Sequence, residues 1–510
     1  KKWQEKTDKN ICLRILSFPF GFITILSLLA TFLVVNLVEW VKMTCGNVSF
    51  SIILLQLTSP IKGTDSGIIN SIIKTAVVPP VLLAVAAVLC YLFIVRGMYA
   101  LEDLPVKKIP RWSKICIEVV MVVFFLHTVQ IQGTEIGMWD YIQSVRESSD
   151  FYEKEYVNPA KVKMTFPKEK KNLIYIFMES MESSYADKED GGTMEDNYIP
   201  NLTKLARENV QFTDKKDGKV GGPVCLEATA YTAGGLIAQT SAINLKVMNS
   251  GAVSDSFLPN LTALGDILNK QGYNQMFLCG SDGDFAGRDA YFKTHKDYQI
   301  EDYKAAIKEG DIPKDYKVYW GHEDKVLYER AKKNLKKLSK EGKPFNLTML
   351  TVDTHFPNGY ICDLCENKYD TTYGNAVACA DRQVYDFVQW IKKQDFYEDT
   401  TIIIAGDHTS MVDTGSKFWK SLSNDYQRTV YNAIINPQCA YKKKVTTKRK
   451  FSTMDMFPTT LAALGVEIDG NKLGLGTNLF SGEETLREEL GANYINKELK
   501  RNDKMYNQFY

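Results

Sequence analysis

Four polar side chains, far apart in the sequence, have the types that one divalent cation beside a nucleophilic hydroxyl requires. They are Glu179, Thr232, Asp407 and His408, and His355 is a further candidate. Glu179 follows the segment NLIYIFM, and Asp407 follows TTIIIAG. Apolar, β-branched segments of this kind predict buried strands. Because chemistry in an open α/β sheet gathers just beyond the carboxyl ends of the strands, we expect these side chains to meet there and the chain to be an enzyme.

The histidine count favours one metal ion over two. Of the five histidines, His127 lies in an apolar segment, which leaves His295, His322, His355 and His408. A two-zinc phosphatase site uses about three histidines, so a single ion is the more economical interpretation. The candidate ligands are rich in oxygen, and we expect Mn²⁺ as the cofactor, with Mg²⁺ or Zn²⁺ as alternatives. For any single acid, a helix cap or a surface position is the other interpretation.

Thr232 is the candidate nucleophile. Small residues follow it (AGG, then LIAQTSAINL), a pattern that predicts the start of a helix. A hydroxyl there lies among free backbone N–H groups at the positive end of the helix dipole, which suits an anionic phosphate. A bound dication would lower the pKa of this hydroxyl and activate it. Two alternatives stay open: Thr232 could only cap the helix, or Thr229 could be the nucleophile.

Composition separates a membrane part from a soluble part of the 510-residue chain. Residues 15–38 and 75–95 contain no charged side chain, and each is long enough to cross the roughly 30 Å hydrocarbon layer as a helix. A third apolar segment, 119–134, spans only if residues 115–117 join it. No small-residue cleavage site follows the first segment, so we expect residues 1–134 to form a retained transmembrane anchor of about three helices.

Basic residues around these segments predict the orientation. One group precedes the first segment and a second lies between the second and third: Lys1, Lys2, Lys6, Lys9 and Arg14, then Arg96, Lys107, Lys108, Arg111 and Lys114. The positive-inside rule places both groups in the cytoplasm and everything after about residue 135 outside it. We therefore expect a multi-pass protein of the cell membrane with an extracytoplasmic domain. If 119–134 does not span, that domain is cytosolic instead.

Charge and cysteines narrow the partners. The net charge of +1 and the lack of a dominant basic stripe argue against nucleic acid. Six of the ten cysteines lie in the expected external domain: Cys225, Cys279, Cys362, Cys365, Cys379 and Cys439. Their even number permits disulfides without fixing the pairing. Cys362-x-x-Cys365 could indicate zinc, but no second C-x-x-C or paired histidine completes a site, so a local disulfide or free thiols is favoured.

Strand-like and helix-like segments alternate along the soluble part. Candidate strands are residues 173–178, 274–279, 345–352, 400–405 and 431–435, and candidate helices are 199–209, 261–271, 325–338, 376–394 and 453–464. This alternation predicts an α/β fold, a largely parallel sheet sandwiched by helices. We expect a linker helix over 135–170, the catalytic domain over 171–482 and a charged tail over 483–510.

An ordered set of motifs is similar to one protein family. The set is NLIYIFMES, YTAGGLIA, FAGRDAYFKTH, WGHEDKVLYERA, KPFNLTMLTVDTHFPNG, IIAGDHTSM and FSTMDMFPTTLAALG with LGLGTNLFSG. It resembles the bacterial phosphoglycerol transferases, namely the lipoteichoic acid synthases and the membrane enzymes that decorate periplasmic glucans, within the alkaline phosphatase and sulfatase superfamily. The resemblance covers about residues 170–480, and the later motifs are closer to the glucan-modifying branch. It implies an alkaline phosphatase/sulfatase-like fold.

The resemblance also implies roles for single residues. Glu179, Asp407 and His408 match the family's metal ligands, and Thr232 matches the nucleophile that also touches the metal. Arg288, in FAGRDAYF, is similar to the arginine that holds the phosphate or glycerol of the substrate; its alternative is a solvated surface arginine. His355 resembles the histidine that contacts the phosphate and could act as acid and base; its alternative is a hydrogen bond that caps a strand end. The chain lacks the T-S-D run of lipoteichoic acid synthases near Thr232, which weakens a polymerase more than a transferase.

The implied activity is transfer of glycerol phosphate from a phosphatidylglycerol-type lipid donor, through a covalent phosphothreonine, to a glycan or polyol-phosphate acceptor. Alternatives are a phosphoethanolamine transferase, another phosphodiester or sulfate ester hydrolase, and an inactive glycan-binding sensor. Sulfatases carry C/S-x-P-x-R, whereas Leu-Glu-Ala-Thr follows Cys225 here. His322 and Asp324, in WGHED, are given only a structural or supporting role, and Asp65 stays unassigned.

Overall fold

The structure is a computed structural model that describes residues 19–45, 50–58, 66–100, 111–216, 218–246, 256–296 and 298–510. Its contacts divide the chain into two units, Lys1–Ser49 with Asp65–Asp140, and Phe50–Thr64 with Tyr141–Tyr510. Asp65 and the basic group before residue 15 lie outside the described residues, as do Lys107 and Lys108.

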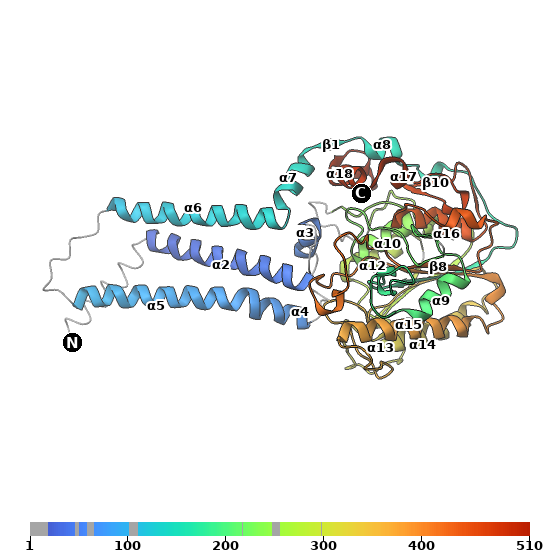
Figure 1. The fold of residues 1–510 in the computed structure, drawn as a ribbon, viewed down its shortest axis with the longest axis horizontal. Coiled ribbons are helices and arrows are strands. Elements are labelled where there is room, and N and C mark those ends of the chain that lie inside the picture. Colours follow the sequence, from blue (N-terminus) through green and yellow to red (C-terminus); the bar gives the residue numbers. More distant parts are fainter. Residues whose placement is uncertain are drawn as a thin grey trace. The chain divides into compact units, whose positions relative to one another are not determined.

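Long apolar helices make up the first unit. They are α2 (Pro19–Cys45), α5 (Val78–Ala100), which continues from α4 (Ser66–Ser71) and η1 (Ile72–Val77), and α6 (Arg111–Glu135), and α2 packs against both α5 and α6 (Figure 1). Within the described part of the chain, three stretches are long and apolar enough to cross a membrane: Ile23–Thr44, Gly67–Cys90 and Ile115–Glu135. The third begins at Ile115, so it includes residues 115–117.

One acidic side chain, Glu118, lies inside the third stretch, which ends at a second acid, Glu135. Glu118 is buried, and its Oε1 accepts a hydrogen bond of 2.8 Å from Thr24 Oγ1 on α2. Large apolar side chains such as Leu82 and Val120 are by contrast more than half exposed. An acid turned toward a neighbouring helix and apolar side chains turned outward form the pattern expected of helices surrounded by lipid.

The second unit contains a six-stranded sheet. Its strands are β3 (Asn172–Met178), β4 (Asn274–Cys279), β5 (Tyr298–Glu301), β6 (Phe345–Leu350), β7 (Thr400–Gly406) and β8 (Asn432–Ile435), in the order β5-β4-β6-β3-β7-β8. All neighbours pair in parallel except β8, which is antiparallel to β7. The predicted, largely parallel α/β sheet is confirmed, with β5 as a strand that the sequence analysis missed.

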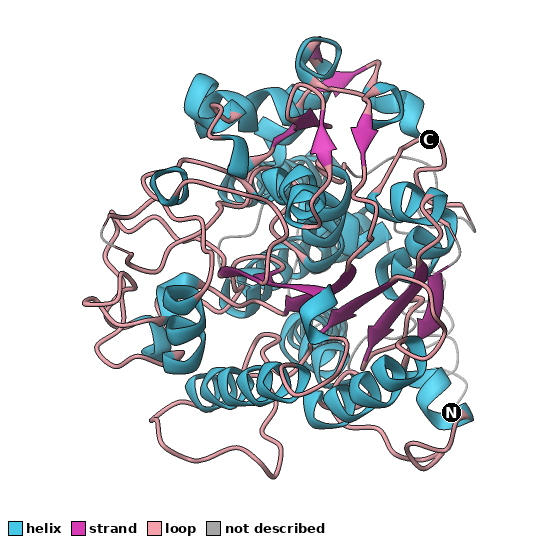
Figure 2. Cartoon of the chain, turned by 90° about the vertical axis from the view of Figure 1, so that its right-hand side faces the viewer, coloured by secondary structure: helices cyan, strands magenta, loops and turns pink. Residues whose placement is uncertain are grey.

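Helices cover both faces of this sheet (Figure 2). One face packs against α9 (Pro200–Glu208), α14 (Asp324–Leu338) and α15 (Thr372–Ile391), and the other against α10 (Thr232–Ser241), α11 (Leu264–Lys270) and α16 (Met456–Ala463). Alternate residues of β3 serve the two faces: Ile174 and Ile176 enter the first core, while the Tyr175 hydroxyl donates to Gln239 of α10. Burial on both faces explains why the central strands are apolar throughout.

The segment that follows the apolar helices and the charged tail lie together in this unit. β1 (Ser148–Ser149) pairs in parallel with β12 (Asn502–Asp503), and the backbone N–H of Tyr152 donates to Asp503.

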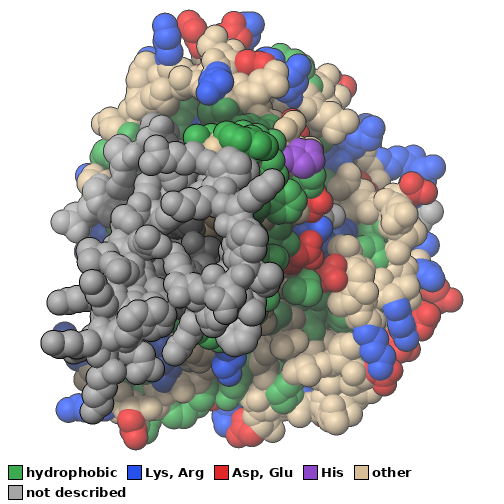
Figure 3. Space-filling view, turned by 90° about the vertical axis from the view of Figure 1, so that its left-hand side faces the viewer, with side chains coloured by type: hydrophobic (Ala, Val, Ile, Leu, Met, Phe, Trp, Pro, Cys, Tyr) green, Lys and Arg blue, Asp and Glu red, His purple; other side chains and the backbone are tan. Residues whose placement is uncertain are grey.

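The remaining elements are α3 (Phe50–Thr58), α7 (Met138–Arg146), α8 (Phe151–Glu155), β2 (Met164–Thr165), α12 (Arg288–Thr294), α13 (Tyr303–Lys308), β9 (Glu467–Ile468), β10 (Lys472–Leu473), β11 (Gly476–Thr477), α17 (Leu486–Leu490) and α18 (Ala492–Lys500), with short 3₁₀ turns between them. Basic and acidic side chains are interspersed around the rim of the face shown in Figure 3.

Candidate active site

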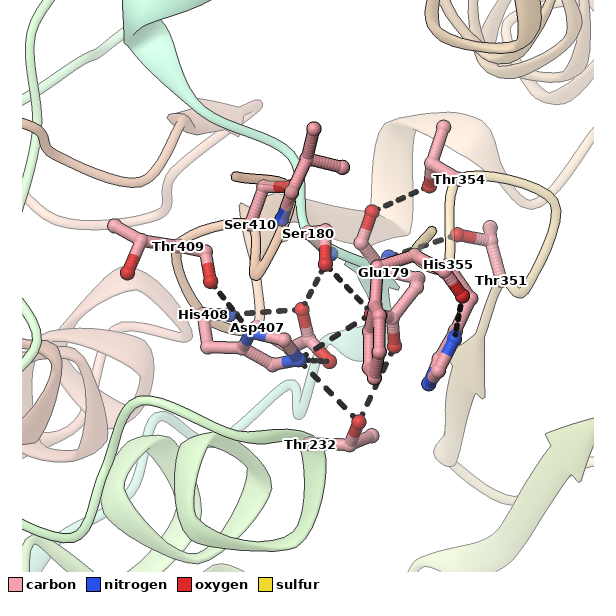
Figure 4. Close-up of polar contacts among 12 residues, drawn as sticks. Glu179, Ser180, Thr232, Thr351, Thr354, His355, Asp407, His408, Thr409 and Ser410 are labelled. Carbon is pink, nitrogen blue, oxygen red and sulfur yellow. Dashed lines mark hydrogen bonds and ion pairs between the residues drawn. The ribbon is translucent and has the colours of Figure 1, made fainter. Parts of the chain in front are cut away.

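The sheet register brings the four candidate residues together. Met178 of β3 is paired with Gly406 of β7, so Glu179 and Asp407 leave neighbouring strands side by side. The hydroxyl of Thr232, the first residue of α10, lies between the Glu179 carboxylate and the His408 ring (Figure 4). Its Oγ1 is 3.2 Å from Glu179 Oε2 and 3.4 Å from His408 Nε2. The ligand atoms of the two acids and His408 lie within 4.8 Å of one another.

Close packing at the start of α10 allows this convergence. A Cβ atom at Gly235 would lie only 2.1 Å from the backbone oxygen of Asp407, so a glycine is required for the helix to approach the end of β7. The Gln239 side-chain amide then donates to the Gly406 carbonyl at 2.9 Å. The small residues after Thr232 therefore set the distance between the hydroxyl and the carboxylates.

Thr232 and Thr229, the other candidate nucleophile, differ in what their hydroxyls contact. Thr229 is fully buried, and its Oγ1 both donates to the Leu226 carbonyl at 3.0 Å and accepts from the Leu226 N–H at 2.8 Å. The residue before α10 is Tyr231, and no side-chain capping bond is recorded there. Thr232 is partly exposed and faces the acids. Of the two threonines, only Thr232 presents its hydroxyl to the candidate ligands.

The buried charges of the set call for a cation. Glu179, Asp407 and His408 are each at most 2% exposed. Asp407 Oδ1 accepts from the backbone N–H groups of Ser180 and His408 at 2.8 and 2.7 Å, whereas Oδ2 is buried without a hydrogen-bond partner among the described residues and lies 3.6 Å from His408 Nε2. A buried carboxylate oxygen without a hydrogen bond, beside a second carboxylate, an imidazole and a hydroxyl, is an arrangement that a divalent ion satisfies. The residues present therefore fit one such ion.

The pKa values express the same charge balance. Burial, then the Glu179 charge, raises the pKa of Asp407 to about 8. Burial would lower the pKa of His408, but Asp407 and Glu179 outweigh it and raise that pKa to about 10. For Glu179 burial acts upward, yet His408 and His355 hold its pKa below the usual range. Protons on Asp407 and His408 thus offset the negative charge of the site. A bound dication would displace these protons and offset that charge instead.

Ser180 contacts two of the candidate ligands, and the sequence analysis did not predict it. Its backbone has a positive φ of 51°, which directs its N–H toward Asp407 while its Oγ donates to Glu179 Oε1 at 2.7 Å. Two threonines that follow β6 fix the backbone of Glu179: the Thr351 hydroxyl accepts from its N–H, and the Thr354 hydroxyl donates to its carbonyl. The only signal in the sequence was a serine next to a candidate ligand, because the backbone conformation that gives Ser180 its role depends on the fold.

His355 lies near the set without contacting Thr232 directly. Its Nδ1 is 2.8 Å from the Phe356 carbonyl, so Nδ1 carries the proton and Nε2 is an acceptor in the neutral ring. The ring packs against Trp320 at 4.6 Å between centroids. Burial lowers the pKa of His355, partly offset by the Glu179 charge. The result is a neutral imidazole within electrostatic reach of the acids.

Arg288 is buried, so the alternative of a solvated surface arginine is wrong. It is 6% exposed at the start of α12, where Nε donates to the Phe285 carbonyl and Nη2 to Ser281 Oγ and the Asp282 carbonyl, at 2.8 to 3.0 Å. Nη1 makes no hydrogen bond to a described residue. The charge of Arg288 makes a small contribution to the lowered pKa of His355, after burial and the charge of His408.

The WGHED segment supports the loop that carries His355. The two carboxylate oxygens of Asp324 accept from the backbone N–H groups of Val352 and Asp353 at 2.7 and 3.2 Å. His322 is fully buried, and its Nε2 has no hydrogen-bond partner among the described residues. Asp324 thus fixes the chain just after β6, three residues before His355.

Comparison with known proteins identifies the class. Residues 171–466, more than half of the chain, match the family model described as Sulfatase, and the chain belongs to the sulfatase family. This range contains the sheet, all four converging residues, His355 and Arg288. The predicted alkaline phosphatase/sulfatase-like fold is confirmed.

Individual relatives agree with the motifs. Over 340 residues the chain is 32% identical to phosphoglycerol transferase I of Salmonella choleraesuis, an alignment that covers 64% of this chain and 41% of that protein. The chain thus spans about two fifths of the length of the curated relatives it matches. The predicted resemblance to the phosphoglycerol transferases is confirmed.

Two solved structures are similar to this chain, and the first of them shares its fold. Lipooligosaccharide phosphoethanolamine transferase A, an integral membrane protein of Neisseria meningitidis, is 14% identical with a TM-score of 0.53, covering 90% of this chain and 87% of that chain. A lipoteichoic acid synthase of Listeria monocytogenes is 19% identical with a TM-score of 0.48, covering 63% and 79%. With three helices of membrane-spanning length and composition, this chain is a membrane protein.

Proposed function

We propose that this protein is a metal-dependent phosphoglycerol transferase that moves glycerol phosphate from a phosphatidylglycerol-type lipid to a glycan or polyol-phosphate acceptor. The observation that carries the proposal is the partly exposed Thr232 hydroxyl, which lies 3.2 Å from one buried ligand and 3.4 Å from another. The 32% identity to phosphoglycerol transferase I over 340 residues supports the choice of donor.

The chain's own residues divide the work of two displacement steps. Thr232 Oγ1 attacks the phosphorus of the donor, the bond from phosphorus to the diacylglycerol oxygen breaks, and glycerophosphoryl-threonine forms. The threonine proton ends on the diacylglycerol oxygen. In the second step an acceptor hydroxyl attacks the same phosphorus, and its proton ends on the released Thr232 oxygen. His355, neutral and with Nε2 free to accept, is suited to relay the proton in both steps.

Glu179, Asp407, His408 and Thr232 would hold the metal ion, with Mn²⁺ favoured and Mg²⁺ or Zn²⁺ as alternatives. When bound, such an ion lowers the pKa of the threonine hydroxyl and offsets charge on the phosphoryl oxygens. Arg288 positions the donor: the fixed guanidinium has Nη1 available for a phosphate oxygen or a glycerol hydroxyl. The start of α10 adds backbone N–H groups that favour an anion.

The apolar helices suit a lipid donor. In the proposed arrangement residues 1–134 form an anchor that crosses the membrane three times, 135–170 a linker, 171–482 the extracytoplasmic catalytic domain and 483–510 the tail. An anchored enzyme stays near the surface where its donor lies, and the diacylglycerol product remains in the bilayer. The three spans of suitable length and hydropathy support this arrangement.

The test is to trap the covalent intermediate. The full chain is incubated in vesicles that contain phosphatidylglycerol labelled in the headgroup, with Mn²⁺ and no acceptor, then digested and mapped by mass spectrometry. We expect glycerol phosphate on Thr232 together with released diacylglycerol. The adduct should be absent in Thr232→Ala and present in the matched control Thr229→Ala, whose hydroxyl faces Leu226. A label on another residue refutes the covalent assignment.

Parallel donors separate the alternatives on this fold. Vesicles with labelled phosphatidylethanolamine should leave Thr232 unmodified; an ethanolamine phosphate adduct there would replace the proposed donor. Release of sulfate from aryl sulfate esters at a rate above lipid turnover would favour a hydrolase. A chain that binds Mn²⁺ but turns over none of these substrates would favour the inactive glycan-binding sensor.

A further inference from the structure

Three cysteines form a second cluster in the catalytic unit. Cys362 and Cys365 lie in the loop between β6 and α15, and Cys379 lies on α15. Cys362 Sγ is 3.6 Å from Cys365 Sγ and 3.9 Å from Cys379 Sγ, and all three sulfurs are within 4.8 Å of one another. The sequence analysis did not favour zinc at these cysteines, because the sequence contains only one C-x-x-C pair and no paired histidine. The fold supplies the third thiol, from a helix that begins after the loop.

The spacing of the sulfurs matches a metal site and not a disulfide. Zinc–thiolate bonds of about 2.3 Å at a tetrahedral angle separate the sulfurs by roughly 3.8 Å. A disulfide would bring two of them to about 2.05 Å. The distances of 3.6 and 3.9 Å lie on either side of the tetrahedral value. The three thiols are therefore already arranged around one common point.

Hydrogen-bond donors surround the sulfurs of this cluster. The backbone amides of Leu364 and Cys365, together with the neighbouring thiols of Cys365 and Cys379, hydrogen-bond the sulfur of Cys362. The Gln383 side-chain amide lies 3.5 Å from Cys379 Sγ and 4.0 Å from Cys362 Sγ. Donors around the ligand sulfurs are the supporting contacts that metal–thiolate sites use.

We propose that Cys362, Cys365 and Cys379 bind one zinc ion whose fourth position is left to solvent. Two of the sulfurs are buried and Cys365 is partly exposed, so an ion can enter from one side. Three thiolates form a soft set that selects Zn²⁺ over Mn²⁺ or Mg²⁺, in contrast to the oxygen-rich set at Glu179.

The ion would fix the loop that carries His355. Residues 351–371 form neither helix nor strand between β6 and α15. A loop of this length needs specific ties to hold one conformation. Asp324 holds its first residues through Val352 and Asp353, and the thiol cluster holds its far part to α15. His355 lies between these two ties, so the zinc would act as a structural clamp for that histidine.

The test measures the metal directly. The full chain is purified in detergent without chelator, in an Asp407→Asn/His408→Gln background that disables the oxygen-rich set. We expect about one tightly bound zinc per chain by elemental mass spectrometry. Replacement by Co²⁺ should give thiolate-to-cobalt charge transfer and the intense visible bands of tetrahedral coordination. Adding Cys379→Ser should remove both signals, and the matched control Cys439→Ser should keep them.

Each outcome decides the proposal without reference to transferase activity. Zinc that persists in the Cys379→Ser chain, or cobalt spectra without sulfur charge transfer, would overturn it. So would a purified chain without zinc in which two of the three cysteines resist alkylation and the mass is lower by two hydrogens, because that is a disulfide. If Cys379→Ser does not fold, the cobalt spectrum of the parent chain and zinc retention by Cys365→His still decide.

Discussion

The two candidate cation sites are built by different parts of the same fold. Glu179, Thr232 and Asp407 come from two strand ends and a helix start, and they meet only once the sheet is in register. Cys362, Cys365 and Cys379 come from one loop and the helix that follows it. The first site therefore forms only through contacts between residues far apart in the sequence, whereas the second forms within one short segment of the chain.

The two sites also differ in the chemistry of their candidate ligands. The oxygen-rich set places a partly exposed hydroxyl against buried acids, so the bound ion would lie where substrate reaches it. The thiol set has two buried sulfurs and one partly exposed sulfur, and among the described residues it has no candidate nucleophile beside it other than its own ligands. Such a difference separates an exchangeable catalytic ion from a retained structural one. Variants that empty one site and leave the other filled test this separation.

The largest effect is expected from Asp407→Asn. It removes a charge from the oxygen-rich set and turns one ligand oxygen into an amide, so the transfer rate should fall by about 10³-fold or more. Zinc on the thiol cluster should stay at the parent level, as measured by elemental analysis of the same sample. Asp399→Asn, the same change at an acid of the surface pair with Lys171, is the control and should keep the parent rate. Loss of both ions in Asp407→Asn would break the comparison.

Ser180→Ala should have the next largest effect. It removes the 2.7 Å hydrogen bond to Glu179 Oε1 but keeps the backbone N–H that binds Asp407. Loss of a contact behind a ligand weakens metal affinity by about 10–100-fold. Titration of Mn²⁺ against activity should show this shift, with the maximal rate at saturating Mn²⁺ close to that of the parent. An unchanged Mn²⁺ requirement would mean that Ser180 does not orient the ligand.

The sequence predicted the oxygen-rich set better than the thiol set, for a physical reason. Glu179 and Asp407 follow strands whose apolar, β-branched residues are buried on both faces, and strand ends in a parallel sheet share one edge. Cys379 has no such marker, because its contact with Cys362 depends on how a loop without regular structure returns to α15. The backbone of Ser180, with φ of 51°, is likewise set by tertiary contacts.

The missed strand β5 illustrates the same limit. Its sequence YQIE alternates apolar and polar residues over only four positions, the lower limit of strand length, and the alternation predicts an exposed acid at its end. In the structure Glu301 is 3% exposed and pairs with Arg330 of α14 at 2.6 Å. A buried ion pair between an edge strand and a helix cannot be read from either segment alone.

Cys379→Ser in the otherwise unchanged chain should affect catalysis moderately. Loss of the clamp would loosen the loop around His355 without touching Thr232 or its neighbours, and we expect kcat/KM to fall by about tenfold. Hydrogen exchange should rise over residues 351–371 and stay unchanged at β3 and β7. Cys439→Ser is the matched control. A parent-like exchange rate in that loop would show that the cluster does not hold it.

The smallest effect concerns His322, which lies beside the same loop support. Burial lowers the pKa of His322 to about 4, against about 6.5 in an unfolded chain. A depressed pKa means that the unfolded state takes up the proton first. The contribution to stability is therefore complete above about pH 6.5 and is lost as the pH falls toward 4. Between about pH 7.5 and pH 5.5 the free energy of unfolding should fall by about 1 kcal/mol from this group.

His322→Gln removes this titration and isolates it from the carboxylates. The free energy of unfolding of the full chain in detergent, followed by denaturant at both pH values, should depend less on pH in the variant than in the parent. The difference between the two slopes is the measured quantity, so a lower overall stability of the variant does not affect it. Equal slopes would mean that the buried ring does not titrate in this range.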